Sequence, residues 1–226
     1  MKKSVIIVAG GKGIRMDSCV PKQFMLLAHK PILMHGINAF VEAFPKIFVV
    51  LVLPSDYIET WSYLCIKYHF TQQHIVVKGG ENRFNSVKNA LEMIRNDQLV
   101  AIHDGARPLV TPTLISRSFT SASFYGNAVP MLPVTESLRI TGETWNRHVN
   151  RNCYCTIQTP QIFHGEILKK AYKADFEESF TDDATVIEKM GEIIHLVEGE
   201  KTNIKITYPF DINIAEVILK ELDTRF

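Results

Sequence analysis

Glycines and basic residues stand close together near the start of the chain. The segment Ala9–Met16 reads AGGKGIRM. Its three glycines are Gly10, Gly11 and Gly13. Glycine leaves backbone N–H groups open to a ligand because it has no Cβ. Arg15 and Lys22 bring two positive charges to the same stretch. A bare backbone loop followed by arginine and lysine is suited to bind a polyphosphate.

Two better-known glycine-rich loops do not match this segment. The dinucleotide fingerprint Gly-x-Gly-x-x-Gly, begun at Gly11, requires a glycine where Met16 stands. The Walker A loop requires a glycine five residues before Gly-Lys and a Ser or Thr after it, but these positions hold Ile6 and Gly13. The alternative to a phosphate loop is a turn that merely links a strand to a helix.

An acidic residue, Asp104, directly follows another apolar run, Leu99–His103. A carboxylate at a strand end beside a phosphate loop is a natural ligand for Mg²⁺, which prefers oxygen ligands and bridges phosphates. Asp104 can also pair with the nearby Arg107. His103 precedes it and points to the opposite face of a strand, so we expect it to be structural.

Basic residues fall repeatedly in predicted loops or at strand ends. They are Arg15, Lys22, Arg107, Arg151 and Lys205. Each alone is more often a solvated surface charge, but five at such positions favour an anionic ligand. The sequence holds neither HExxH nor Gly-x-Ser-x-Gly. A phosphate monoester, whose second pKa is about 6, is already a nucleophile at neutral pH. Joining it to a nucleotide requires charge neutralisation and in-line positioning, with no general base.

The apolar pattern predicts how these residues are positioned. Strand-like runs at Ser4–Val8, Ile47–Leu53, His74–Val77 and Leu99–His103 alternate with helical segments at 34–44, 55–68 and 84–95. We place Ser55 as the N-cap of the second helix. This alternation predicts an α/β fold with a doubly wound, mainly parallel sheet. Ligands bind beyond the carboxyl ends of such strands. Residues 10–22, 79–86 and 104–107 should therefore converge.

The pattern changes after a strand at Asn127–Leu132. Residues 135–155 alternate polar and apolar side chains around a turn at Thr141–Glu143, which predicts a β-hairpin arm. We expect a second subunit to cover such an arm. The alternative is that the hairpin folds back on its own domain. Beyond it, Thr181 or Asp182 can cap a helix that continues to Lys189. We expect one domain over residues 1–226, with the arm at about 135–155.

Composition narrows the class of protein. The 226 residues are 46% hydrophobic and carry a net charge of +1, which does not point to nucleic acid or to a membrane surface. We find no membrane-spanning run and no signal peptide. The four cysteines, Cys19, Cys65, Cys153 and Cys155, form no CxxC pair. They read as reduced thiols of an intracellular protein, so we expect a cytoplasmic location.

The ordered motifs resemble a known family. Ala9–Met16 followed by Pro21-Lys22-Gln23 is similar to the signature loop of nucleotidylyltransferases that activate small sugar or polyol phosphates. Four further motifs narrow the resemblance to the cytidylyltransferases of the non-mevalonate isoprenoid pathway, and the likeness covers essentially the whole chain. These motifs are His103–Pro108 (HDGARP), Thr159–Gln161 (TPQ), Thr181–Ala184 (TDDA) and Asn203–Thr207 (NIKIT).

The resemblance implies a Rossmann-like nucleotidyltransferase. It transfers CMP from CTP to methylerythritol phosphate with Mg²⁺ and releases pyrophosphate. The implied catalytic residues are Arg15, Lys22 and Lys205. The implied nucleotide-binding residues are Ala9, Gly10, Gly11, Gly13, Gly80, Glu81, Ser86 and Asp104, and Asp104 is also the implied metal ligand. The implied substrate-binding residues are Arg107, Ser137, Arg151, Thr159 and Thr181. The family exchanges its arm within a homodimer, so Ser137 and Arg151 are expected to complete the partner's pocket.

Three other functions stay open at this point. A sister enzyme acts on ribitol 5-phosphate and shares nearly all of these motifs, although the Ala106-Arg107-Pro108 and Asp182-Asp183-Ala184 variants favour methylerythritol phosphate. A regulator would bind CTP without turnover, but it has no need of lysines directed at the α-phosphate. An oxidoreductase that uses a dinucleotide is disfavoured by Met16.

Overall fold

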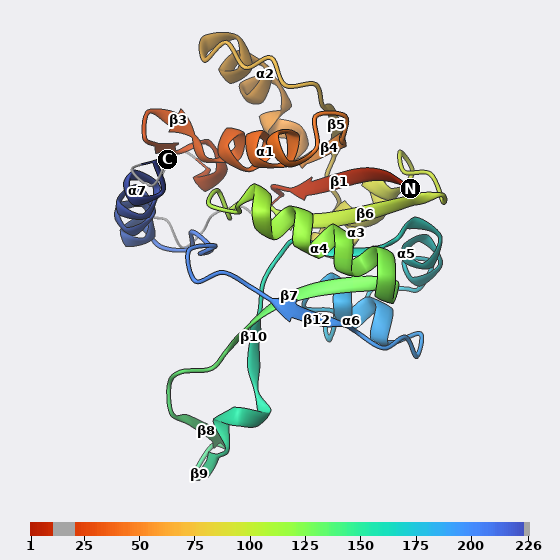
Figure 1. The fold of residues 1–226 in the computed structure, drawn as a ribbon, viewed down its shortest axis with the longest axis vertical. Helices are drawn as coiled ribbons and strands as arrows, with labels where there is room; N and C mark the ends of the chain where they lie inside the picture. Colours follow the sequence, from red (N-terminus) through yellow and green to blue (C-terminus); the bar gives the residue numbers. More distant parts are fainter. Residues whose placement is uncertain (11–20, 224–226) are drawn as a thin grey trace.

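A twisted sheet forms the centre of the molecule (Figure 1). The computed structural model describes residues 1–10 and 21–223. Within this part, the eight-stranded sheet has the order β10-β7-β11-β6-β1-β4-β5, and β12 pairs with β7. These strands are β1 (Lys2–Val8), β4 (Phe48–Leu53), β5 (Ile75–Lys78), β6 (Gln98–Asp104), β7 (Asn127–Pro133), β10 (Cys155–Ile157), β11 (Gln161–His164) and β12 (Leu196–Glu198). A small separate pair joins β2 (Leu26–Leu27) to β3 (Lys30–Pro31).

The core of the sheet is parallel, as the apolar runs predict. Strand β1 pairs in parallel with both β4 and β6, and β4 pairs in parallel with β5. Residues 4–7 of β1 are buried, which fits a strand covered on both faces. Strand β11 departs from this pattern, because it lies antiparallel between β6 and β7. The sheet is therefore mainly parallel, with the carboxyl ends of β1, β4, β5 and β6 at one edge.

Helices cover both faces of the sheet (Figure 1). Alternate residues of β1 join different cores, since Val5 and Ile7 belong to one cluster and Ile6 to the other. The first face carries α1 (Ile32–Ala43), α2 (Ile58–Lys67) and α4 (Pro112–Tyr125). The second carries α3 (Arg83–Leu91), α5 (Gly165–Ala171) and α6 (Asp183–Glu188). The chain closes with α7 (Pro209–Asp223).

Local hydrogen bonds decide where the helices begin. Ser55 is not the cap of α2: its hydroxyl donates to Asp56, and residues 55–57 form a 3₁₀ turn before the α-helix begins. Of the two residues predicted to cap α6, Thr181 and Asp182, the cap is Asp182, whose carboxylate accepts from the Thr185 N–H in a capping box. None of the described helices combines the length and apolar character needed to cross a bilayer.

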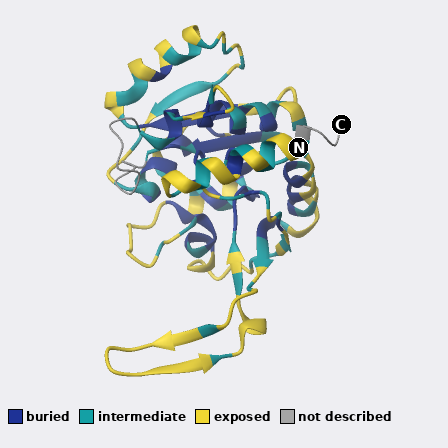
Figure 2. Ribbon diagram, turned by 90° about the vertical axis from the view of Figure 1, so that its left-hand side faces the viewer, coloured by how far each residue is buried: buried dark blue, intermediate teal, exposed yellow. Residues whose placement is uncertain are grey.

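The predicted arm is present as a hairpin of β8 (Leu138–Thr141) and β9 (Asn146–Val149). It projects from the body of the molecule, and most of its residues are exposed (Figure 2). Trp145 and Ile140 are among the exposed side chains. The structure therefore contradicts the alternative in which the hairpin folds back on its own domain. That a second subunit covers the arm stays a prediction.

Candidate functional site

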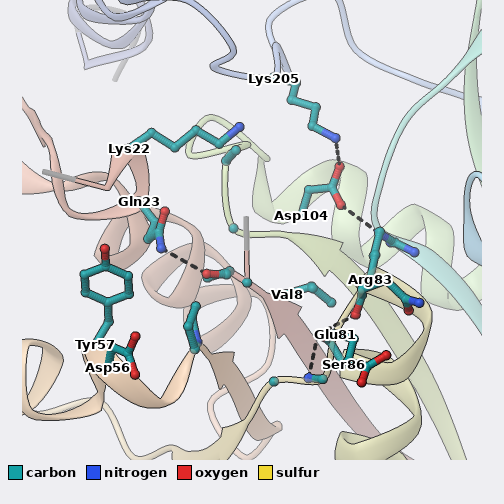
Figure 3. A pocket seen from close by; sticks show the side chains of 18 residues that line it. Val8, Lys22, Gln23, Asp56, Tyr57, Glu81, Arg83, Ser86, Asp104 and Lys205 are labelled. Carbon is teal, nitrogen blue, oxygen red and sulfur yellow. Dashed lines mark hydrogen bonds and ion pairs between the residues drawn. The ribbon is translucent and has the colours of Figure 1, made fainter. Parts of the chain in front are cut away.

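The carboxyl ends of four parallel strands open into one cavity (Figure 3). Its volume is about 620 Å³. The walls come from the ends of β1, β4, β5 and β6, from the 3₁₀ turn at Lys22–Phe24, and from Lys205 near the end of the chain. The predicted convergence is confirmed for the described parts of the three segments, because Gly10, Lys22, residues 79–83 and residues 104–106 all line the cavity. The predicted residues that line it are Ala9, Gly10, Lys22, Gly80, Glu81, Ser86, Asp104 and Lys205.

Backbone hydrogen bonds fix the chain where it leaves β1. The Ala9 N–H donates to the Val52 carbonyl at 3.0 Å, and the Ala9 carbonyl accepts from the Gln23 side chain at 3.0 Å. Gln23 is buried, so this bond is shielded from water. Gly10 consequently enters the cavity wall in a fixed orientation. Three predicted residues, Gly11, Gly13 and Arg15, lie outside the described residues.

Ser86 holds the turn that follows β5. Its hydroxyl accepts from the Gly80 N–H at 3.1 Å and donates to the Asn82 carbonyl at 2.8 Å. The Asn82 side chain in turn caps α3 by accepting from the Asn85 N–H. A Cβ on Gly80 would lie 2.5 Å from the Cβ of Asn85, so this position requires glycine. Glu81 is thereby placed on the cavity wall.

Asp104 lies between two cations. Its carboxylate is 2.7 Å from the Lys205 ammonium and 3.4 Å from Nε of Arg83. Burial alone would raise the pKa of Asp104, but Arg83 and Lys205 outweigh it and hold that pKa well below its usual range. The carboxylate is therefore ionised at neutral pH. Arg107 instead donates to the Asn203 carbonyl at 2.7 Å.

Arg83 is a cavity residue that the sequence analysis did not identify. Its two terminal nitrogens donate to both oxygens of Asp183, at 2.9 and 2.6 Å. Burial lowers the pKa of Arg83, but the charges of Asp183 and Asp104 outweigh burial and raise it, so the guanidinium stays charged. A usable signal was its position directly after the glycine turn at 79–82, at the start of a helix. Its partner lies 100 residues away in the TDDA motif.

A chain of hydrogen bonds through Thr159 and His103 holds the backbone of Asp104 in place. The Asp104 N–H donates to the Thr159 hydroxyl at 3.0 Å, and this hydroxyl lies 3.1 Å from Nδ1 of His103. Nε2 of His103 lies 3.1 Å from the Arg107 carbonyl. Burial lowers the pKa of His103 to about 4, so the ring is neutral and Nε2–H is the donor to that carbonyl. His103 is structural, as predicted.

Lys22 and Lys205 approach the cavity from neighbouring segments (Figure 3). The Lys22 ammonium donates to the Ile206 carbonyl at 3.2 Å, and the Ile206 N–H donates to the Ala106 carbonyl at 2.8 Å. The Asn203 side chain adds a bond to the Thr159 carbonyl at 2.9 Å. The segment around Lys205 is thus fixed to the turn after β6.

The predicted substrate-binding residues do not line this cavity. Ser137 and Arg151 are exposed on the arm, and Arg151 donates to the Thr135 carbonyl. Thr159 is buried beneath Asp104, and Thr181 is exposed beside a second cavity of about 730 Å³. Their roles stay predictions. Within the described part of the chain, three or more His, Cys, Asp or Glu side chains do not gather into a metal-binding group.

A parallel sheet whose carboxyl edge carries glycine-containing turns, two lysines and an ionised aspartate is the arrangement expected of an enzyme that binds a nucleoside triphosphate, such as a nucleotidyltransferase. The model of the family described as IspD, 2-C-methyl-D-erythritol 4-phosphate cytidylyltransferase, matches residues 4–221. The chain belongs to this family.

Relatives and solved structures agree with this assignment. The chain is 46% identical over 219 residues to the 2-C-methyl-D-erythritol 4-phosphate cytidylyltransferase of Bacteroides thetaiotaomicron, covering 97% of this chain and 100% of the relative. It is also 46% identical over 219 residues to the protein of that name from Porphyromonas gingivalis, covering 96% and 98%. The crystal structure of the protein of that name from Thermus thermophilus superposes with a TM-score of 0.79 at 31% identity, covering 97% of this chain and 100% of that one.

We expect Gly80→Ala to weaken CTP binding. The added Cβ must push against the backbone and Cβ of Asn85, which displaces the turn that carries Glu81. Isothermal titration calorimetry with CTP should show a lower affinity. Gly36→Ala in α1 is the matched control, because its Cβ meets its nearest neighbour at an ordinary 3.9 Å and should leave affinity unchanged. Equal affinities for Gly80→Ala and the unmodified protein would contradict this role of the turn.

Proposed function

We propose that this protein transfers CMP from CTP to 2-C-methyl-D-erythritol 4-phosphate and releases pyrophosphate. The family match over nearly the whole chain supports the reaction. The observation that carries the proposal is the convergence of Lys22, Lys205 and Asp104 on one cavity walled by backbone turns. Such a cavity offers positive charge to a triphosphate and polar backbone groups to a nucleoside.

The nucleoside binds against the turns that end β1 and β5. Both turns are fixed by hydrogen bonds with buried side chains, since Gln23 donates to the Ala9 carbonyl and Ser86 accepts from the Gly80 N–H. Fixed donors and acceptors recognise a base and ribose without reorganisation when the ligand arrives. Ala9, Gly10 and Gly80 supply backbone groups, and Glu81 supplies a carboxylate that can accept from an exocyclic amino group such as that of cytosine.

The triphosphate lies toward the lysines. A phosphate oxygen of the polyol phosphate attacks the α-phosphorus of CTP and forms the new P–O bond. The bond from the α-phosphorus to the bridging oxygen breaks, and pyrophosphate leaves with the electron pair. Lys22 and Lys205 stabilise the negative charge that develops around the α-phosphorus, and we assign Arg15 to the same role.

Asp104 is suited to hold a divalent cation together with the triphosphate. Mg²⁺ in nucleotide sites commonly takes one or two carboxylates and completes its shell with phosphate oxygens and water. Asp104 is ionised and stands on the cavity wall, so it fits as a single protein ligand. When bound, the ion supplies charge neutralisation to the triphosphate. A cation held by Asp104 would compete with Lys205 for the carboxylate, and the Lys205 ammonium would then be available to a phosphate oxygen.

The polyol phosphate is held by two subunits. Ser137 and Arg151 are exposed, and the arm that carries them projects away from its own body (Figure 2), which supports a role for both residues in the site of another copy. We therefore include a homodimer with exchanged arms in the proposal, with Arg107, Thr159 and Thr181 on the receiving side. The three cysteines among the described residues are free thiols, which supports a cytoplasmic location.

The test of this function is pyrophosphate release from CTP with each polyol phosphate in turn. We expect a clear preference for 2-C-methyl-D-erythritol 4-phosphate. Preferred turnover of ribitol 5-phosphate would assign the sister activity instead. CTP binding with no pyrophosphate from either alcohol would identify a non-catalytic regulator.

We expect Lys22→Ala and Lys205→Ala to impair turnover much more than CTP binding. Each variant loses a cation that acts mainly on the charge developing in the transition state. We expect transition-state stabilisation to fall by about 2 to 4 kcal/mol, by analogy with the removal of an oxyanion-hole donor. Steady-state kinetics and CTP titration give the two quantities. Lys189→Ala is the control, because Lys189 pairs with Glu177 on an exposed surface. Parallel losses of turnover and affinity would rule out this role.

We also expect two inactive variants to restore each other's activity when mixed. In a dimer of Arg151→Ala with Lys22→Ala, one site receives an intact arm and keeps its own Lys22. Random exchange of subunits should then restore about a quarter of the sites. Pyrophosphate release after mixing and re-equilibration measures this.

A shortened arm provides the control for subunit exchange. Deletion of residues 141–146 removes the hairpin turn and should weaken the dimer in sedimentation velocity. No recovery of activity on mixing, together with an unchanged dimer after the deletion, would refute the shared arm.

A further inference from the structure

Four charged side chains of alternating sign form a continuous chain that runs from the core to the cavity wall. Asp183 pairs with Arg83, Arg83 with Asp104, and Asp104 with Lys205. Figure 3 shows the part that faces the cavity, with Asp104 between Arg83 and Lys205. The two ends differ in exposure, because Asp183 is fully buried whereas the Lys205 side chain is 46% exposed.

The buried end is a rigid anchor. Both oxygens of Asp183 accept from the guanidinium of Arg83, and one also accepts from the Tyr172 hydroxyl at 2.6 Å. The Asp183 N–H donates to the Gln161 side chain at 3.1 Å, which ties the start of α6 to β11. Burial, reinforced by the nearby Asp183 charge, raises the pKa of Tyr172 well above its usual value, so its hydroxyl stays a donor.

The guanidinium geometry leaves one donor directed at the cavity. Nη1 and Nη2 of Arg83 are committed to Asp183, while Nε lies 3.4 Å from Asp104. A planar fork of this kind can hold two carboxylates at once, which a single ammonium cannot do in the same geometry. Asp104 thus has one partner fixed to the core and one on a flexible side chain.

In the proposed reaction Lys205 leaves Asp104, whereas Arg83 stays beside it. When Lys205 turns to a phosphate oxygen, Asp104 loses its partner at 2.7 Å. Of the two cations that contact Asp104, only Arg83 then remains, with Nε at 3.4 Å from the carboxylate. Arg83 cannot follow the phosphate in the same way, because Asp183 holds it in place.

We propose that Arg83 is a positioning residue, anchored by Asp183, that keeps Asp104 aimed into the cavity while Lys205 transfers to the nucleotide. This inference rests on the proposed function. Asp183 and Tyr172 then support catalysis only through their contacts with Arg83 and with each other. Neither belongs to the described residues that line the cavity.

The first experiment separates positioning from folding. Arg83→Gln leaves Asp183 buried without its ion pair, so we pair it with the double variant Arg83→Gln/Asp183→Asn, which removes both charges. We expect both variants to lower kcat at least about tenfold, with CTP affinity changed less than about threefold, because a small displacement of a reacting group is enough for such a loss. Recovery of kcat together with thermal stability in the double variant would show a merely structural role.

Two further variants sharpen the comparison. Arg83→Lys keeps the charge but cannot hold both carboxylates, so its kcat should remain low; full rescue by lysine would overturn the proposal. Arg95→Gln is the matched control, since Arg95 makes a similar pair with Asp97 at 3.1 Å on an exposed surface. It should leave both kcat and CTP affinity unchanged.

The outcome is separable from that of the proposed function. If the unmodified protein releases no pyrophosphate in the same assay, the proposed function fails, and the position of Asp104 becomes the readout. Crystal structures of Lys205→Ala, alone and combined with Arg83→Gln/Asp183→Asn, should then show the Asp104 carboxylate rotated only where Arg83 is also replaced, because Lys205 otherwise holds it at 2.7 Å. An unmoved carboxylate in the combined variant would overturn the inference on Arg83 whether or not the enzyme is active.

Discussion

The ionised carboxylate of Asp104 is the interaction on which the site depends. It ends the central strand β6, and the chain around it is arranged to keep it charged although it is largely buried. A hydrogen-bond chain through Thr159 and His103 fixes its backbone from below, while Arg83 and Lys205 hold its oxygens from two sides. Burial opposes the charge, and two nearby cations outweigh burial. The position of Lys205, and through it the shape of the cavity, follows from this balance.

The same balance explains how the cavity tolerates a concentration of basic residues before its ligand arrives. Lys205 is neutralised by Asp104, and Arg83 by Asp183, so these cations do not stand together as a bare cluster of like charges. When a triphosphate binds, Lys205 exchanges its carboxylate partner, Asp104, for a phosphate oxygen. The cavity wall then needs little reorganisation. Electrostatic stabilisation is most effective when its groups are already in place, because no energy is spent on orienting them during reaction.

Some of this arrangement could be predicted from the sequence and some could not. The runs that form β1, β4 and β6 are evident in the sequence, and parallel topology brings their carboxyl ends together with that of β5, so Lys22, Glu81 and Asp104 were predictable neighbours. The Arg83–Asp183 pair was not, since its members lie 100 residues apart and either one alone resembles an ordinary surface charge. The cap predicted at Ser55 was wrong because its hydroxyl bonds a neighbouring side chain. Arg15 falls outside the described residues, and its place in the site stays a prediction.

The antiparallel strand β11 has a consequence for the order in which the sheet is assembled. It separates β6 from β7 and comes after both in the sequence, so these strands have no common partner until residue 164 has left the ribosome. During synthesis the β1–β4–β5–β6 half can form first, with an unpaired edge on β6. Insertion of β11 closes that edge and brings Thr159 beneath Asp104. The joining of the two parts of the sheet and the backbone support of Asp104 thus depend on the same strand.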